Sequence, residues 1–213
     1  MTRGARLFGL PIVAMLAGCV HTPVQPQIAF DRTNCDAAFV TDEAAPLKFD
    51  PKNIVETDVR LNGQGRCVRT EDAAADYYAS FVLPRSNTGY TLSVGALPED
   101  LSLLAPQIRL MNEQGEVTRS FTAERFLFRG NRLTVLVQPR PDETRLVVLS
   151  DHKLVGQTLS RVQESVNTTT YASGTPRVAV LFAVRSGEDE ATETTFSFAG
   201  LLKIATLPIE TKS

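Results

Sequence analysis

Tryptophan is absent from this 213-residue chain, and histidine and cysteine are scarce, with two and three copies. Neither His21 nor His152 lies near Cys35 or Cys67, so the ligand spacing that holds zinc is missing. The chain also has no glycine-rich phosphate loop and no HExxH motif. We therefore expect no metal and no cofactor, and we find no catalytic signature among the short motifs.

A strong charge of either sign is also missing. The chain carries 22 basic and 24 acidic residues, a formal net charge of −2. Nucleic-acid binders concentrate positive charge in a patch, and anionic lipid headgroups attract polybasic segments. No stretch beyond residue 18 is apolar over the about 20 residues that a membrane-spanning helix needs. We expect a water-soluble domain downstream of residue 18 and no nucleic-acid partner.

The longest apolar run lies at the start of the chain, over Leu7–Ala17, after a segment that contains Arg3 and Arg6. A charged start, an apolar middle of ~7–15 residues and small residues at the cut are the layout of a secretory signal peptide. The segment ends in Leu16-Ala17-Gly18-Cys19. This tetrapeptide resembles the lipobox of bacterial lipoproteins, in which the Cys thiol is acylated, by palmitate among other chains, and the polypeptide is cut just before it.

Two other interpretations of this segment stay open: a plain signal peptide with an incidental Cys19, and a single membrane-spanning helix, for which the run is short. The lipoprotein interpretation places a signal peptide at 1–18, a lipid-anchored tether at 19–34 and one periplasmic domain at 35–213. Pro23 and Pro26 favour an extended spacer in the tether. Val20 stands where an Asp often signals inner-membrane retention, so the resemblance implies the outer membrane.

Two cysteines, Cys35 and Cys67, remain in the predicted domain. An even number of cysteines in an oxidising compartment favours a disulfide, which would stabilise the domain by roughly 3–4 kcal/mol. Two separate buried thiols are the alternative. Between the cysteines the pattern is irregular, and Asn62-Gly63-Gln64-Gly65 has turn residues. We predict a loop-rich cover with short strands, joined at both ends by the cysteines.

Downstream of Cys67 the pattern is mostly that of β-strands. Two hairpins are predicted, one from the strands 77–83 and 90–94 and one from the strands 107–111 and 116–121. Further strands are predicted at 133–137, 145–149, 177–184 and 194–204, the last with a bulge or break at Gly200. Many short strands with frequent turns indicate a mostly β protein, an antiparallel β-sandwich with one short helix.

That helix is predicted at 153–166, where apolar residues recur at close to helical spacing. The segment 100–104 is either one helical turn or a loop. The polar run 166–174 is predicted as a loop, and the charged segment 186–190 as an exposed turn.

Several strand-like pieces from Tyr90 onward resemble the maltose-operon periplasmic protein (MalM) family. They are Tyr90-Thr91-Leu92-Ser93-Val94, Leu104-Ala105-Pro106-Gln107-Ile108-Arg109-Leu110, Arg132-Leu133-Thr134-Val135-Leu136-Val137, Arg145-Leu146-Val147-Val148-Leu149-Ser150 and Gly200-Leu201-Leu202-Lys203-Ile204. The resemblance covers a little over half of the chain. It implies an accessory protein of carbohydrate, maltodextrin-type, transport, with an outer-membrane porin or sugar-uptake components as partners. The family supplies no catalytic residues, and the lipobox and the cysteine pair depart from its pattern.

We expect no enzyme. Ser150-Asp151-His152 contains the residue types of a nucleophilic triad, but neighbours in sequence point apart, and a polar turn explains them better. Asp142-Glu143 and the acidic residues 188–190 offer carboxylates, although such charge runs are usually solvated turns. We therefore assign no catalytic residue.

Carbohydrate binding is the sharper hypothesis, because sugar sites commonly stack exposed aromatic rings on apolar sugar faces. The candidate rings for an oligosaccharide are Tyr77, Tyr78, Tyr90 and Tyr171, and one of the consecutive Tyr77 and Tyr78 should face outward from a strand. Packing in the core or at an edge is the alternative for each. The other function class is an adaptor lipoprotein of the outer-membrane envelope that has no sugar ligand and binds its partner through sheet edges and loops.

Overall fold

The computed structural model describes residues 22–164, 167–175, 178–186 and 189–209. Strands dominate it, and burial alternates along the strands that form the body, as in β5 (Tyr90–Leu97) and β16 (Gly200–Pro208). Because successive residues of a strand face opposite sides of a sheet, this alternation gives each sheet one face toward a common core.

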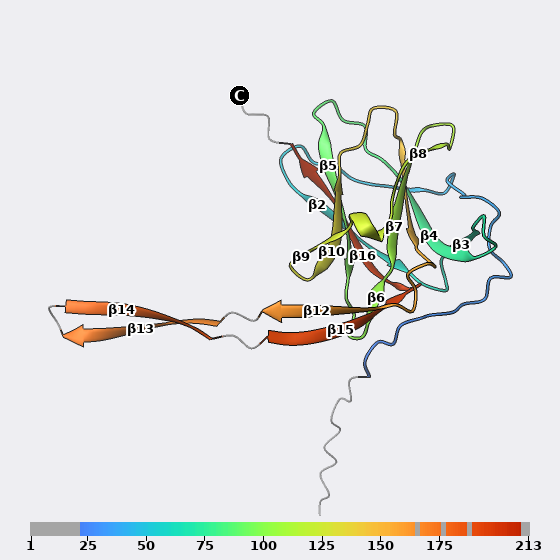
Figure 1. Ribbon diagram of the computed structural model, residues 1–213. Helices are drawn as coiled ribbons and strands as arrows, with labels where there is room; N and C mark the ends of the chain where they lie inside the picture. The colour runs from blue at the N-terminus through green and yellow to red at the C-terminus, as the bar shows by residue number, and fades with distance from the viewer. Residues whose placement is uncertain (1–21, 165–166, 176–177, 187–188, 210–213) are drawn as a thin grey trace, which may run out of the picture.

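Two sheets make up the body (Figure 1). The first, sheet A, has the order β1-β4-β11-β7-β8, with β3 also paired to β4. Its strands are β1 (Ala45–Pro46), β3 (Arg66–Arg69), β4 (Ala75–Val82), β7 (Pro106–Met111), β8 (Val117–Phe121) and β11 (Arg145–Ser150). The second, sheet B, has the order β2-β16-β5-β10-β9 and adds β2 (Val55–Leu61), β9 (Leu127–Arg129) and β10 (Arg132–Val137) to β5 and β16.

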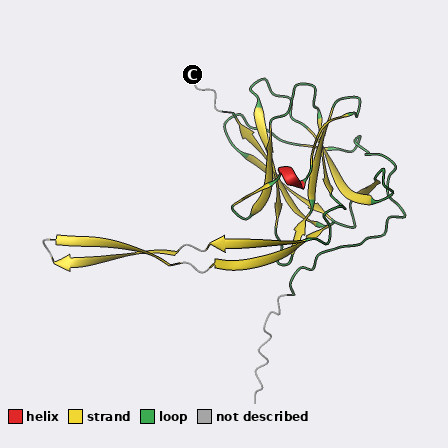
Figure 2. Cartoon of the chain, viewed as in Figure 1, coloured by secondary structure: helices red, strands yellow, loops and turns green. Residues whose placement is uncertain are grey.

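The inner faces of the two sheets share one hydrophobic core. Sheet A contributes Ile108, Leu146 and Val148, and sheet B contributes Leu92 and Leu202, all fully buried. The predicted β-sandwich is therefore confirmed. In the part of the chain that the structure describes, the only helix is a single 3₁₀ turn, η1 (Ala123–Arg125), shown in red in Figure 2.

The predicted hairpins had different outcomes. The second is confirmed, because β7 and β8 pair across the turn that begins at Asn112. The first is wrong: β4 lies in sheet A and β5 lies in sheet B. The connection that contains Pro84 carries the chain across the sandwich instead of reversing it within one sheet.

The helix predicted at 153–166 is also wrong. A turn follows β11, Gly156 has a left-handed φ of +87°, and β12 (Thr158–Glu164) then pairs with β15 (Asp189–Ser197). The left-handed residue breaks any helix, and a partner strand distant in sequence overrides the local periodicity.

Two further predictions concern the same region. The loop predicted at 166–174 is wrong where the structure describes it, because β13 (Asn167–Thr175) pairs with β14 (Val178–Ser186). Residues 187–188 of the predicted turn lie outside the described residues. The predicted break at Gly200 is confirmed, since β15 ends at Ser197 and β16 begins at Gly200.

These strands form two smaller sheets. β12 pairs with β15, which also pairs in parallel with β6 (Ser102–Leu104), while β13 and β14 pair with each other. We call β13 and β14 the ribbon. Figure 1 shows the β12–β15 pair extending from one end of the sandwich, with the ribbon beyond it.

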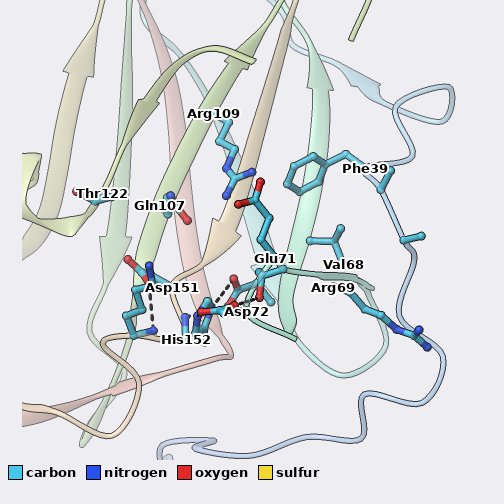
Figure 3. A pocket seen from close by; sticks show the side chains of 15 residues that line it. Phe39, Val68, Arg69, Glu71, Asp72, Gln107, Arg109, Thr122, Asp151 and His152 are labelled. Atoms are coloured by element: carbon cyan, nitrogen blue, oxygen red, sulfur yellow. Dashed lines mark hydrogen bonds and ion pairs between the residues drawn. The ribbon is translucent and has the colours of Figure 1, made fainter. Parts of the chain in front are cut away.

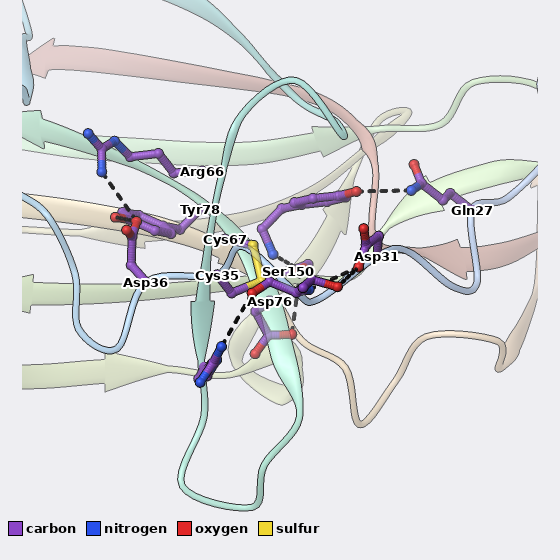
Figure 4. The surroundings of a disulfide bond; sticks show 12 residues. Gln27, Asp31, Cys35, Asp36, Arg66, Cys67, Asp76, Tyr78 and Ser150 are labelled. Atoms are coloured by element: carbon purple, nitrogen blue, oxygen red, sulfur yellow. Dashed lines mark hydrogen bonds and ion pairs between the residues drawn. A yellow bond between two sulfur atoms is a disulfide. The ribbon is translucent and has the colours of Figure 1, made fainter.

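A disulfide joins Cys35 to Cys67 in β3, with a Cα–Cα distance of 4.7 Å, so the predicted pairing is confirmed (Figure 4). The segment before it, residues 22–34, has no strand or helix but contacts the body. Gln27 donates its N–H to Ser197 Oγ at 2.9 Å, and Phe30 stacks on Tyr77 with ring centroids 4.1 Å apart. No helix in the described ranges is long and apolar enough to cross a membrane.

Candidate functional site

A cavity of about 530 Å³, lined by both apolar and charged residues, lies on the outer face of sheet A, where β4 and β7 begin and β11 ends (Figure 3). The strands there present a small apolar cluster that includes Val68, Tyr78 and Leu149, and Phe39 packs on it from the segment after Cys35. Because the cluster covers only part of this face, polar residues line the rest. We call this cavity the sheet A pocket.

The centre of the sheet A pocket is an imidazole held between two carboxylates. His152 Nδ1 lies 2.9 Å from Asp76 Oδ2, and His152 Nε2 lies 2.9 Å from Asp72 Oδ2. The His152 backbone N–H also donates to Asp76 Oδ1 at 2.9 Å. We call these three residues the His152 clamp. It ties the end of β11 to the start of β4 and to the turn before β4.

The turn that carries Asp72 is set by local backbone geometry. The Thr70 N–H donates to the Ala74 carbonyl oxygen at 3.0 Å, and Ala73 adopts a left-handed φ of +60°. Thr70 Oγ1 also donates to the Asp72 carboxylate. The turn therefore presents Asp72 to His152 while leaving half of the Asp72 side chain exposed.

The environment moves the pKa values of all three residues. Burial raises the pKa of Asp76 and outweighs its hydrogen bonds with His152. Hydrogen bonds from Thr70 and His152 lower the pKa of Asp72. Burial alone would lower the pKa of His152, but its hydrogen bonds to Asp76 and Asp72 outweigh burial, and its pKa is raised. The clamp therefore favours a protonated imidazole.

Ser150 takes no part in a nucleophilic arrangement with His152. Its side chain is fully buried, and its Oγ accepts the Tyr77 N–H at 2.9 Å and lies 3.5 Å from Asp76 Oδ1. A working nucleophile needs a hydrogen bond to its base. The prediction that Ser150-Asp151-His152 closes the strand as a polar turn agrees with this geometry, although the contact with Asp76 was not predicted.

Arg109 lies across the pocket from the His152 clamp (Figure 3). Arg109 lies in the middle of β7, and its guanidinium carbon is 5.2 Å from the centre of the Phe39 ring. Arg109 Nε is buried and has no hydrogen-bond partner. Figure 3 shows the Glu71 carboxylate directed toward this guanidinium. No hydrogen bond or ion pair joins the side chain of Arg109, or the ammonium of Lys153, to another residue whose side chain the structure describes.

The candidate tyrosines lie away from this pocket or below its surface. Tyr77, Tyr78 and Tyr90 are 5%, 2% and 6% exposed, so the expectation that one of the first two faces outward is wrong. Tyr77 packs in the sandwich core and Tyr78 under the segment that carries Phe39, because both faces of β4 are covered. Tyr171 lies in β13, and its side chain falls outside the described part. Packing, not ligand stacking, explains the three that are described.

Only one of the two acidic residues Asp142 and Glu143 is solvated, as expected for an exposed turn. Asp142 is exposed, but the Glu143 side chain is fully buried. Glu143 accepts hydrogen bonds from Arg119 Nε at 2.7 Å, from the Arg140 N–H at 2.7 Å and from Thr118 Oγ1 at 2.8 Å. Glu143 and Arg119 therefore form a structural ion pair. Among the described residues we find no group of side chains arranged to hold a metal.

The ribbon offers a second candidate surface, read from its backbone pairing. The register pairs Thr169 with Val184, Tyr171 with Phe182, Ser173 with Val180 and Thr175 with Val178. Alternate residues of a strand share a face. One face of the ribbon therefore holds four apolar residues of β14, while the other face holds mostly small or polar residues.

Two residues that matter to the pocket escaped the sequence analysis. Asp76 belongs to a stretch too short to assign, and its partner His152 is 76 residues away. Arg109 was part of a correctly predicted strand, and the alternation in Gln107-Ile108-Arg109 places it on the same face as Gln107. That shared face was the only available signal.

Comparison of the sequence with protein-family models and with curated proteins, and of the fold with solved structures, gives no match.

Proposed function

We propose that this protein is a lipid-anchored periplasmic accessory protein of carbohydrate, maltodextrin-type, transport that acts as an adaptor on the outer membrane. It binds a second envelope protein, and this contact, not catalysis, is its activity. The observation that carries the proposal is the ribbon, a pair of long strands that extends beyond the sandwich (Figure 1).

The ribbon favours a protein partner because of its open edges. In the described part of the chain, β13 pairs only with β14, and β14 only with β13. Each strand therefore has an outer edge of backbone N–H and C=O groups that can accept another strand. We propose that the occupant is an extended segment of an envelope protein, added by backbone hydrogen bonding, with the apolar residues of β14 giving specificity.

The location rests on the sequence at Cys19. Its lipobox supports acylation and transport to the outer membrane, and the Cys35–Cys67 disulfide fits an oxidising compartment. Residues 1–21, which hold the signal peptide and Cys19, lie outside the described residues. The sugar-uptake pathway rests on the resemblance to the maltose-operon periplasmic protein family.

The second candidate is an adaptor lipoprotein with no link to sugar uptake. The burial of Tyr77, Tyr78 and Tyr90 favours an adaptor of either kind over a protein that stacks sugar on these rings. The two candidates differ only in the identity of the partner, so the test has to identify it.

The test uses the full-length lipoprotein in its own envelope. A photo-crosslinking residue is placed at Thr170 in the ribbon, with Asn87, an exposed loop residue of the body, as the control position. A second strain carries a shortened protein in which Asn-Gly replaces residues 165–188. Glu164 and Asp189 are register partners, so a two-residue turn can close the shortened hairpin.

We expect one crosslink from position 170 to a porin or transporter of maltodextrins, none from position 87, and slower maltodextrin uptake in the shortened strain. A crosslink to another envelope protein with unchanged uptake would favour the second candidate. If position 170 gives no crosslink beyond those seen from position 87, the adaptor role is contradicted.

A further inference from the structure

The edge strands of the body are protected against the addition of another strand. Proteins protect such edges with charged residues, short strands or irregular pairing. In sheet B, β2 carries Glu56, Asp58 and Arg60, and β9 is only three residues long. In sheet A, β1 has two residues, and the pairing of β8 with β7 shifts register beside Met111.

The outer edge of β14 in the ribbon lacks this protection. Residues 178–184 contain no charge, no proline and no glycine, and four of the seven are valine or phenylalanine, which favour strands. β13, on the other side of the ribbon, is mostly polar and contains Gly174. An uncharged apolar strand with a free edge pairs readily with another strand. The β14 edge is therefore the better candidate for strand addition.

The same edge becomes acidic closer to the body. We call the hairpin of β12, β13, β14 and β15 the arm (Figure 1). β15 follows β14 in the chain, and up to residue 194 the described pairing of both strands is with β13 and β12 alone, so their free edges lie on one side of the arm. Along this side β15 carries Asp189, Glu190 and Glu193. β6 covers it only from Thr195 onward.

β12 does not neutralise these three acids. Their register partners are Glu164, Gln163 and Ser160, none of which is basic. Glu193 is exposed and has no ion-pair partner among the described side chains. The four strands of the arm contain four acidic residues against two basic ones, Arg161 and Arg185. The edge therefore offers an apolar stretch followed by negative charge.

We infer that the ribbon receives an extended segment in which lysine or arginine residues precede an uncharged strand with alternating apolar residues. The segment adds to the β14 edge in the antiparallel sense, which is the more stable pairing. Its uncharged part then lies along residues 178–184 and its basic part along residues 189–193. Backbone hydrogen bonds supply the contact, and opposite charges select the partner. The inference rests on the proposed function, in which the ribbon binds an envelope protein, and names the edge and the chemistry of the bound segment.

The binding test uses the full-length lipoprotein in detergent and two synthetic peptides of about 16 residues, enough to span the edge in extended form. Both end in the same stretch of alternating valine and threonine. One begins with three lysines spaced by threonine, and the other has glutamate in place of each lysine. At low ionic strength we expect the lysine peptide to bind about tenfold more tightly, with a smaller difference in about 0.5 M salt, because exposed charges are screened. Equal affinities at low ionic strength would overturn the inference.

Variants locate the charges that matter. The double variant Asp189→Asn and Glu193→Gln removes two acids from one face of β15 and should lose most of the preference for the lysine peptide. The matched control, Asp42→Asn with Glu124→Gln, removes two exposed acids of the body and should keep the preference. The same preference in both double variants would overturn the assignment to β15.

Hydrogen exchange identifies the edge and its occupant. The lysine peptide should slow exchange of backbone amides in β14 and in residues 189–194, and leave β13 unchanged, because only the free side of β14 and β15 gains hydrogen bonds. Protection of β13 in place of β14 would overturn the choice of edge. Protection of β14 without peptide that grows with protein concentration would show that a second copy occupies the edge, and would also overturn the inference.

The inference and the adaptor role fail in different ways. A crosslink from position 170 to an envelope protein, together with equal affinities of the two peptides, would overturn the inference and leave the adaptor role intact. Absence of any specific crosslink from position 170 would contradict the adaptor role itself.

Discussion

The Asp76 carboxylate accepts two hydrogen bonds from His152, one from its backbone N–H and one with its ring Nδ1, both at 2.9 Å. Asp76 is 1% exposed, so nearly all of the water that would solvate its charge has been removed. The contact offsets part of that loss and fixes the end of β11 against the start of β4. The rim of the sheet A pocket is built on it.

Replacing Asp76 with Asn should lower the free energy of unfolding by about 1.5–3 kcal/mol, because hydrogen bonds to a charged group are lost. Urea unfolding followed by circular dichroism measures this change. Asp42→Asn, at an exposed position, is the control and should change stability by less than about 0.5 kcal/mol. Equal effects of the two substitutions would show that the clamp contributes nothing.

The clamp should also make stability depend on pH. The pKa of His152 is raised in the folded state, so its contribution is fully present below the unfolded pKa near 6.5 and is lost as pH rises through the folded value. The stability difference between the unmodified protein and His152→Gln should therefore be larger at pH 5.5 than at pH 8.5. Urea unfolding at the two pH values checks this, and a difference that grows with pH would contradict it.

Glu143 should be among the residues most sensitive to substitution. Its fully buried carboxylate faces Arg119, so Glu143→Gln leaves a partly buried guanidinium without its counterion and should cost about 3–5 kcal/mol. Glu124→Gln, in the exposed η1 turn, is the matched control. In the double variant with Arg119→Met the two losses should not add, because both remove the same interaction. Additive losses would show that the pair is not coupled.

Changing both Cys35 and Cys67 to Ser should destabilise the domain by roughly 3–4 kcal/mol, since the bridge restricts the unfolded chain. Thermal unfolding of the oxidised protein, the reduced protein and the double variant measures this. The reduced protein and the variant should agree. A variant as stable as the oxidised protein would show that the cover between the cysteines holds without the bond.

The strands could be predicted where the signal is local. Tyr90–Val94 and Gln107–Met111 alternate over their own length, so no knowledge of their partners was needed. The sheet to which each strand belongs could not be predicted, because no local pattern in residues 77–94 indicates that the chain crosses from sheet A to sheet B after Pro84.

The failures share one physical cause. Residues 158–164 form a strand because β15, some thirty residues later, pairs with them, and the left-handed φ of Gly156 prevents a continuous helix across the preceding turn. The His152 clamp and the contact between Arg109 and Phe39 likewise join residues that lie far apart in the sequence. Alternation along the strand predicts that one of Tyr77 and Tyr78 is exposed, whereas Phe39 packs over Tyr78 on the outer face of sheet A and Tyr77 lies in the core.

The attachment of Gln27 and Phe30 to the body would limit how far a protein anchored through Cys19 could stand from a membrane. Between Cys19 and Gln27 the polypeptide has eight Cα-to-Cα steps, and a fully extended chain covers at most ~3.3–3.6 Å per residue. An acylated Cys19 would therefore keep the anchored end of the sandwich within about 30 Å of the bilayer surface. Any partner would then have to bind the protein close to the bilayer surface.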